Sequence, residues 1–95
     1  MIEKHEVHQE IRQYILEATL SNKNDIQDET LLFEQGFFDS MGLLFLVDFI
    51  RDTFDIDTKD DELIVENFES INCIVAFVIR NLELKKIGES IIYQE

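Results

Sequence analysis

The amino-acid sequence predicts an all-α protein: a small four-helix bundle with a long loop between the first two helices and a short third helix. Its 95 residues are enough for one domain. Proline is absent and glycine occurs three times, so few residues interrupt helices. Apolar residues recur at helical spacing in three segments, and no long segment alternates apolar and polar residues as a strand does. We expect residues 1–84 to form the domain and residues 85–95 to be a flexible or lightly docked C-terminal tail.

The first helix is predicted over residues 3–20. Its apolar positions, three and four residues apart, are Val7, Ile11, Tyr14, Ile15 and Ala18. The polar residues 21–25, SNKND, have turn chemistry and end this helix. A long connection follows, in which the apolar residues 31–33 need to tuck against the core through a single turn. Gly36 then allows a sharp bend before the next helix.

The second helix, predicted over residues 40–54, has two apolar faces. One face should point into the core and carries Leu43, Leu46, Val47, Ile50 and Phe54. The opposite face carries Met41, Leu44, Phe45, Asp48 and Asp52. Apolar side chains beside carboxylates are typical of a surface that binds partner proteins. The alternative is that a loop or the tail covers this face.

The remaining helices are shorter or less strongly marked. A polar loop over residues 54–61 leads to a short third helix at residues 61–66. Ser70 is a suitable N-cap for a fourth helix that runs to about Leu82. The apolar stripe of that helix is Ile71, Ile74, Val75, Val78 and Leu82.

The net charge of −13 restricts the possible partners. It repels nucleic acid and anionic membranes, and it attracts basic patches on other proteins. The single cysteine, Cys73, excludes an internal disulfide and suits a reducing compartment. The first ten residues contain no signal-peptide core, and the longest apolar run, residues 41–47, is too short to cross a bilayer. We therefore expect a soluble cytoplasmic monomer that binds no nucleic acid and does not insert into membranes.

Three other features have residue types that could form a binding site. Residues 55–66 place four acids at EF-hand positions, but Asp60 stands where the frame needs glycine and Lys59 where it needs an oxygen ligand. We expect residues 55–66 to be a solvated loop. Loose binding of divalent cations is the alternative. His5 and His8 should be solvated rather than zinc ligands, because no third histidine exists. Cys73 is expected to be a small buried core residue. No metal site is predicted.

Ser40 opens the second helix, where two roles are possible. A serine at a helix start satisfies free backbone N–H groups. Asp39 is an equally good cap, which would leave the Ser40 hydroxyl free. The N–H groups and the dipole of a helix N-terminus favour an anion such as a phosphodiester.

Residues 34–83 resemble the acyl carrier protein family. The resemblance centres on Gly36, Asp39, Ser40 and Met41, within EQGFFDSMG, and continues in ELIVENFESINCIVAFV at residues 62–78. It implies that Ser40 bears a 4′-phosphopantetheine arm through a phosphodiester bond, and that cargo is held on the arm as a thioester. It implies a carrier rather than an enzyme. The segment EQGFFDSMG is similar to the corresponding segment of stand-alone carriers, including D-alanyl carrier proteins.

The implied partners follow from that resemblance. A phosphopantetheinyl transferase would recognise Asp39, Ser40 and the exposed face of the second helix. An adenylating acyl or aminoacyl ligase would load the arm, and an acyltransferase or condensing enzyme would unload it. Two alternatives from other classes are an unmodified helical interaction module that uses the same apolar face, and a divalent-cation-binding acidic protein.

Overall fold

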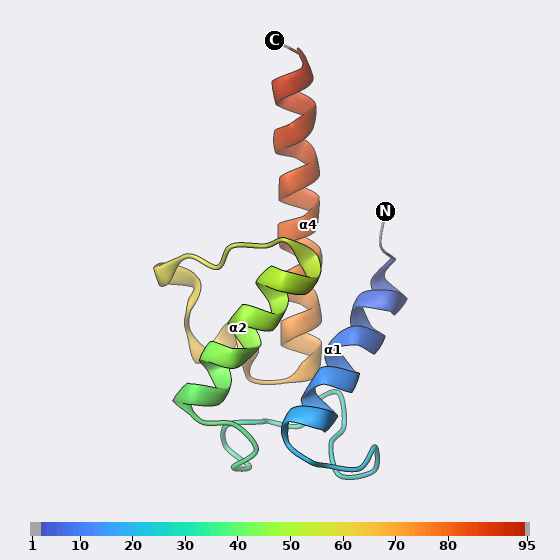
Figure 1. Ribbon diagram of the computed structural model, residues 1–95, viewed down its shortest axis with the longest axis vertical. Helices are drawn as coiled ribbons and strands as arrows, with labels where there is room; N and C mark the ends of the chain where they lie inside the picture. Colours follow the sequence, from blue (N-terminus) through green and yellow to red (C-terminus); the bar gives the residue numbers. More distant parts are fainter. Residues whose placement is uncertain (1–2, 95) are drawn as a thin grey trace.

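The computed structural model describes the backbone of residues 3–94 and the side chains of residues 3–85. This part of the chain is all-helical and contains no strand, which confirms the predicted small helical bundle (Figure 1). The elements are α1 (Lys4–Ala18), α2 (Ser40–Phe54), a 3₁₀ turn η1 (Asp60–Glu62), α3 (Val65–Phe68) and α4 (Ile71–Gln94).

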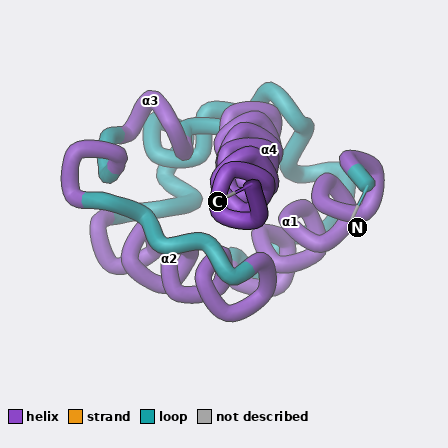
Figure 2. The backbone as a smooth tube through the Cα atoms, turned by 90° about the horizontal axis from the view of Figure 1, so that it is seen from above, coloured by secondary structure: helices purple, strands orange, loops and turns teal. Residues whose placement is uncertain are grey.

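The helices are arranged around α4. Each of α1, α2 and α3 contacts α4, and the view from above shows α4 end-on with the other helices around it (Figure 2). The C-terminal part of α4 extends beyond the rest of the bundle (Figure 1). The helices therefore share one core, which lies along the N-terminal half of α4.

The core contains the stripes that helical spacing predicts, together with apolar residues from the connections. The buried helical residues are Val7, Ile11, Ile15, Leu46, Ile50, Phe54, Phe68, Ile71, Ile74, Val75, Phe77 and Val78. Ile26, Leu32, Phe38 and Ile56 are buried from the loops. Of the predicted core residues, Tyr14, Leu43, Val47 and Leu82 are half-buried at its edge. Ala18 is exposed, so its assignment to the core stripe was wrong.

Helix α1 ends two residues before the predicted bound. Leu20 adopts a left-handed conformation with φ of 55° and is 94 % exposed, so the helix cannot continue through it. The N–H of Thr19 still donates to the carbonyl oxygen of Ile15, which closes the last turn.

The connection between α1 and α2 is held by hydrogen bonds. The guanidinium of Arg12 donates to the carbonyl oxygens of Lys23 (2.7 Å) and Ile26 (2.8 Å). Leu32 is fully buried, and its N–H donates to the carbonyl oxygen of Glu69 at 2.7 Å. A hydrogen-bonded turn therefore brings the apolar segment to the core, as predicted, although Leu31 remains exposed.

Gly36 lies in the left-handed region with φ of 84°, and a Cβ there would meet no atom within 4 Å. Only backbone strain should therefore oppose a side chain at this position. Gly36→Ala should lower the free energy of unfolding by about 1–2 kcal/mol in urea denaturation. Gly36→Asn should lose less, because asparagine tolerates this conformation. Equal losses for both variants would contradict the conformational explanation.

The third helix differs from the prediction. Residues 61–66 do not form one helix, because the Glu62 side chain accepts the N–H of Lys59 (3.0 Å) and closes η1. Ile64 is then extended, and α3 begins only at Val65.

Helix α4 begins as predicted and ends later. The hydroxyl oxygen of Ser70 accepts the N–H of Cys73 at 3.2 Å, which confirms Ser70 as the N-cap. The helix continues past Leu82 to Gln94, because residues 83–86 are good helix formers and no proline follows. Apart from Lys85, the side chains of the predicted tail lie outside the described residues.

Candidate functional site

The start of α2 presents one serine with a free hydroxyl. Asp39 is the N-cap: its backbone is extended, and its Oδ1 accepts the N–H of Gly42 at 2.9 Å. Ser40 is the first helical residue and is exposed, and its hydroxyl makes no hydrogen bond to any residue that the structure describes. Of the two capping possibilities, the structure therefore selects Asp39.

Aromatic packing holds the chain immediately before Ser40. Phe38 is buried and packs edge-on against Phe33, with ring centroids 5.9 Å apart. The Phe38 ring also lies against Gly42, where an added Cβ would be 3.3 Å from two ring atoms. Glycine at this position therefore lets the first turn of α2 sit directly on the loop that precedes it.

The Asp39 cap leads to a stability prediction. Asp39→Ala removes the acceptor for the Gly42 N–H, so we expect a loss of about 1 kcal/mol of unfolding free energy. Asp39→Asn keeps a side-chain oxygen as acceptor, so its unfolding free energy should fall by at most a few tenths of a kcal/mol. Thermal or urea unfolding of both variants measures the difference. If asparagine were as harmful as alanine, the hydrogen bond to Gly42 would not be the cause.

The predicted partner-binding face of α2 lies on the surface. Met41, Leu44 and Phe45 are 56 %, 51 % and 59 % exposed. Neither a loop nor any other described part of the chain covers them. The opposite face is buried in the core, as predicted. The helix therefore carries two apolar faces, of which one has no partner within the described residues.

The two carboxylates on this face both form ion pairs with Arg51, which the sequence analysis did not predict. Arg51 donates to Asp48 at 2.9 Å, and its Nε lies 3.8 Å from Asp52. The spacing of three residues between Asp48 and Arg51 was the available signal. All three side chains are exposed, so these ion pairs contribute little to stability. Any basic partner would meet carboxylates that are already partly neutralised.

A groove of about 440 Å³ lies beside Ser40, between the end of α1 and the start of α2. Its lining includes both neighbours of Ser40, Asp39 and Met41. Tyr14 forms one wall and stacks on Phe49 of α2, with ring centroids 4.2 Å apart. Burial, and to a lesser extent the negative charge of Asp48, raise the pKa of the Tyr14 hydroxyl. The phenol therefore stays protonated at neutral pH.

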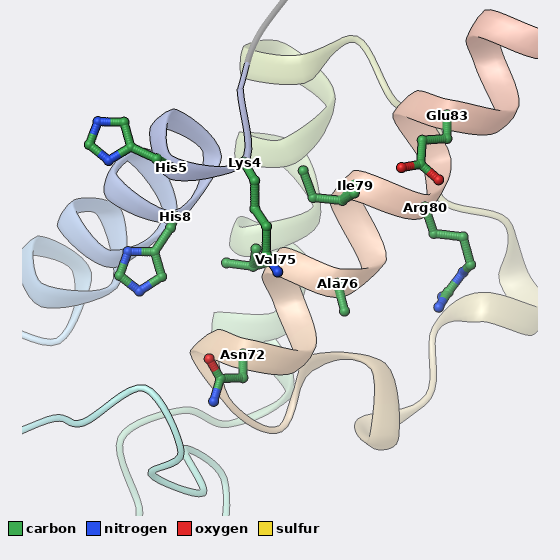
Figure 3. A pocket seen from close by; sticks show the side chains of 9 residues that line it. All are labelled: Lys4, His5, His8, Asn72, Val75, Ala76, Ile79, Arg80 and Glu83. Atoms are coloured by element: carbon green, nitrogen blue, oxygen red, sulfur yellow. The ribbon is translucent and has the colours of Figure 1, made fainter.

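A second, larger groove of about 800 Å³ lies between α1 and α4 (Figure 3). Lys4 reaches from α1 toward Val75 of α4 in this view. His8 is not simply solvated, as the sequence suggested, because its Nε2 lies 2.9 Å from Asp28 Oδ2. His5 is exposed. This groove lies on a different pair of helices from Ser40.

The other sequence features form no binding site. Within residues 3–85, whose side chains are described, no three histidine, cysteine or acidic residues are grouped to hold a metal ion. Asp55, the first EF-hand position, instead pairs with Lys85, and this hydrogen bond and charge lower the pKa of Asp55. Cys73 is half-buried rather than fully buried, because it lies beside the core stripe of α4 and not on it.

No family model matches the chain, and no curated protein matches it. Over the described residues, every helix is too short or too polar to cross a membrane. Function is therefore inferred from the fold and from the geometry around Ser40.

Proposed function

We propose that this protein is a carrier that bears an acyl or aminoacyl group on a 4′-phosphopantetheine arm attached to Ser40. One observation carries the proposal. Asp39 caps α2, so the Ser40 hydroxyl is exposed at the helix N-terminus with no competing hydrogen bond among the described residues. The exposed face of α2 begins at the next residue, Met41.

The residues around Ser40 fit such a group. The attachment would place a negatively charged phosphodiester at the N-terminus of a fifteen-residue helix, where free N–H groups and the dipole favour an anion. When bound, the arm supplies a terminal thiol that holds the cargo as a thioester. The chain itself supplies the attachment point and the recognition surface, and no catalytic residue is required of it.

The surface around Ser40 suits several successive partners. A phosphopantetheinyl transferase would read Asp39, Ser40 and the apolar residues of α2. A ligase and an acyltransferase or condensing enzyme would use the same face, with Asp48 and Asp52 meeting their basic patches. The net charge of −13 would speed these encounters and make them sensitive to salt. We place the carrier in the cytoplasm as a monomer, where the free thiol of Cys73 stays reduced.

Mass spectrometry of the intact protein tests the modification. The transferase moves the phosphopantetheinyl group from coenzyme A to Ser40 Oγ, adenosine 3′,5′-bisphosphate leaves, and the serine proton passes to solvent. Co-expression with a transferase should add the mass of one such group. Ser40→Ala should abolish the gain, whereas Ser21→Ala, the matched control outside α2, should keep it. An unmodified protein alongside a modified control carrier would overturn the proposal.

A second candidate function is supported by the exposed face itself. Met41, Leu44 and Phe45 form a surface that an unmodified helical interaction module would also use. In that case partner binding would survive Ser40→Ala and would not depend on a transferase. A pull-down of partners with the wild-type and Ser40→Ala proteins distinguishes the two functions.

A further inference from the structure

Aromatic side chains gather in the groove beside Ser40. The groove is lined by Tyr14 and Ala18 from α1, Phe37 and Phe38 from the loop, and Met41 and Phe45 from α2. Phe45 is more than half exposed, although a ring of this size is normally buried. The lining thus leaves apolar surface in contact with water next to the proposed attachment point.

The core side of α2 offers cargo less room than this groove. Leu46 and Ile50 on that side have no exposed surface, and neither do Ile74 and Val78 of α4. A cargo group entering between these helices would have to displace packed side chains, which a dense core resists. The groove between α1 and α2 is already open and needs no such displacement.

We infer that the groove between α1 and α2 holds the cargo, and that this cargo is an apolar acyl group. The inference rests on the proposed function and names the substrate class for the same site. The groove presents somewhat more apolar than polar surface. Its polar side-chain groups are the Tyr14 hydroxyl and the Asp39 carboxylate, which accepts the Gly42 N–H, and its other side chains are those of alanine, phenylalanine and methionine. An apolar chain or ring that covers the phenylalanine rings of the groove removes apolar surface from water on both sides, which is favourable. A small aminoacyl group such as alanyl has too little apolar surface to provide this gain.

Because the cargo is tethered, the groove can hold it even if its affinity for the free group is low. Cargo held on an arm at Ser40 binds in an intramolecular step, at a high effective concentration. Asp39 and Met41, on either side of Ser40, both line the groove, so the path from the attachment point to the binding surface is short. The Tyr14 hydroxyl makes no hydrogen bond to the described residues and is a free donor for an oxygen of the arm or cargo.

Amide chemical shifts of the loaded protein test the inference. A transferase supplied with coenzyme A, octanoyl-coenzyme A or alanyl-coenzyme A would give three forms, each verified by mass. We expect the octanoyl form to differ from the unloaded form at Tyr14, Phe37, Met41 and Phe45. The alanyl form should differ only close to Ser40.

The two alanines of the chain provide a matched pair of variants. Ala18→Trp fills the groove from an exposed position on α1, and it should remove the octanoyl-dependent shifts while leaving the mass gain intact. Ala76→Trp makes the same change at an exposed position in the other groove (Figure 3) and should leave the shifts unchanged.

The outcomes separate the two proposals. Failure of any mass gain at Ser40 overturns the carrier function and this inference with it. A normal gain with octanoyl shifts that map to the core side of α2 and α4, or with no shifts beyond Ser40, overturns the groove assignment alone. Larger groove shifts for alanyl than for octanoyl overturn the apolar substrate class.

Discussion

Replacing Phe77 with alanine should lower the free energy of unfolding by about 3–5 kcal/mol. Phe77 is 1 % exposed at the centre of the part of α4 that the other helices surround. Its ring packs against Phe68 of α3 with centroids 5.0 Å apart, and the Arg80 guanidinium lies over it at 5.7 Å. Truncation would leave a cavity that helices on several sides cannot easily close.

The loss would be a large part of the total stability. Domains of this kind are stable by about 5–15 kcal/mol, and a charge of −13 on 95 residues works against compactness. We therefore expect the variant to be substantially unfolded at low salt and partly rescued at high salt. Far-UV circular dichroism during urea denaturation, at two salt concentrations, measures both effects.

Phe45→Ala is the matched control for this prediction. The same side chain is removed, but from a position 59 % exposed on α2. Its effect should stay within about 1 kcal/mol, since no packed cavity forms. Similar losses at Phe45 and Phe77 would mean that the described core does not dominate stability.

Local signals in the sequence were sufficient to predict α2. Asp39 has the chemistry of an N-cap, and the apolar face of residues 43–54 has the period of a helix. Both signals act within a few residues, so the predicted bounds 40–54 agree with the structure. The prediction that Ser70 caps α4 is confirmed for the same reason.

Elsewhere, interactions that helical spacing does not reveal set the structure. Leu20 ends α1 through its left-handed backbone, and the Glu62 side chain divides the predicted third helix by accepting the Lys59 N–H. Neither effect changes the apolar pattern from which the bounds were predicted. The end of α4 was placed too early because the apolar stripe weakens after Leu82, although good helix formers continue.

In the candidate site too, local features could be predicted from the sequence and features that depend on the fold could not. Ser40 and the exposed face of α2 were predicted because they lie on one helix. The groove beside Ser40 was not, because its walls come from α1, the long loop and α2. Helical spacing places Ala18 in the core stripe, whereas it is exposed, and it predicts no position for Phe37 and Phe38. Only the fold brings Tyr14 and Ala18 next to residues that follow them by about 20 to 30 positions in the chain.

Phe45→Asp should reduce kcat/KM of a phosphopantetheinyl transferase for this carrier by about 30-fold or more. An aromatic residue at the centre of an interface is typically a hot spot worth about 2 kcal/mol, which corresponds to that factor. The added carboxylate lies on the face of Asp48 and Asp52, which already pair with Arg51, so the expected loss comes from the missing aromatic contact and not from weaker attraction of a basic partner. The fold should remain intact, because Phe45 lies outside the core.

Leu84→Asp distinguishes a recognition surface from a general effect of charge. Leu84 is 59 % exposed, like Phe45, but lies on α4. The variant carries the same added charge and should keep wild-type kcat/KM. If both variants lost activity equally, the transferase would be responding to net charge rather than to α2. Phe45→Asp alone should lose activity while remaining folded by circular dichroism. In that case Phe45, the exposed aromatic residue of α2, would be the side chain by which the transferase recognises the carrier.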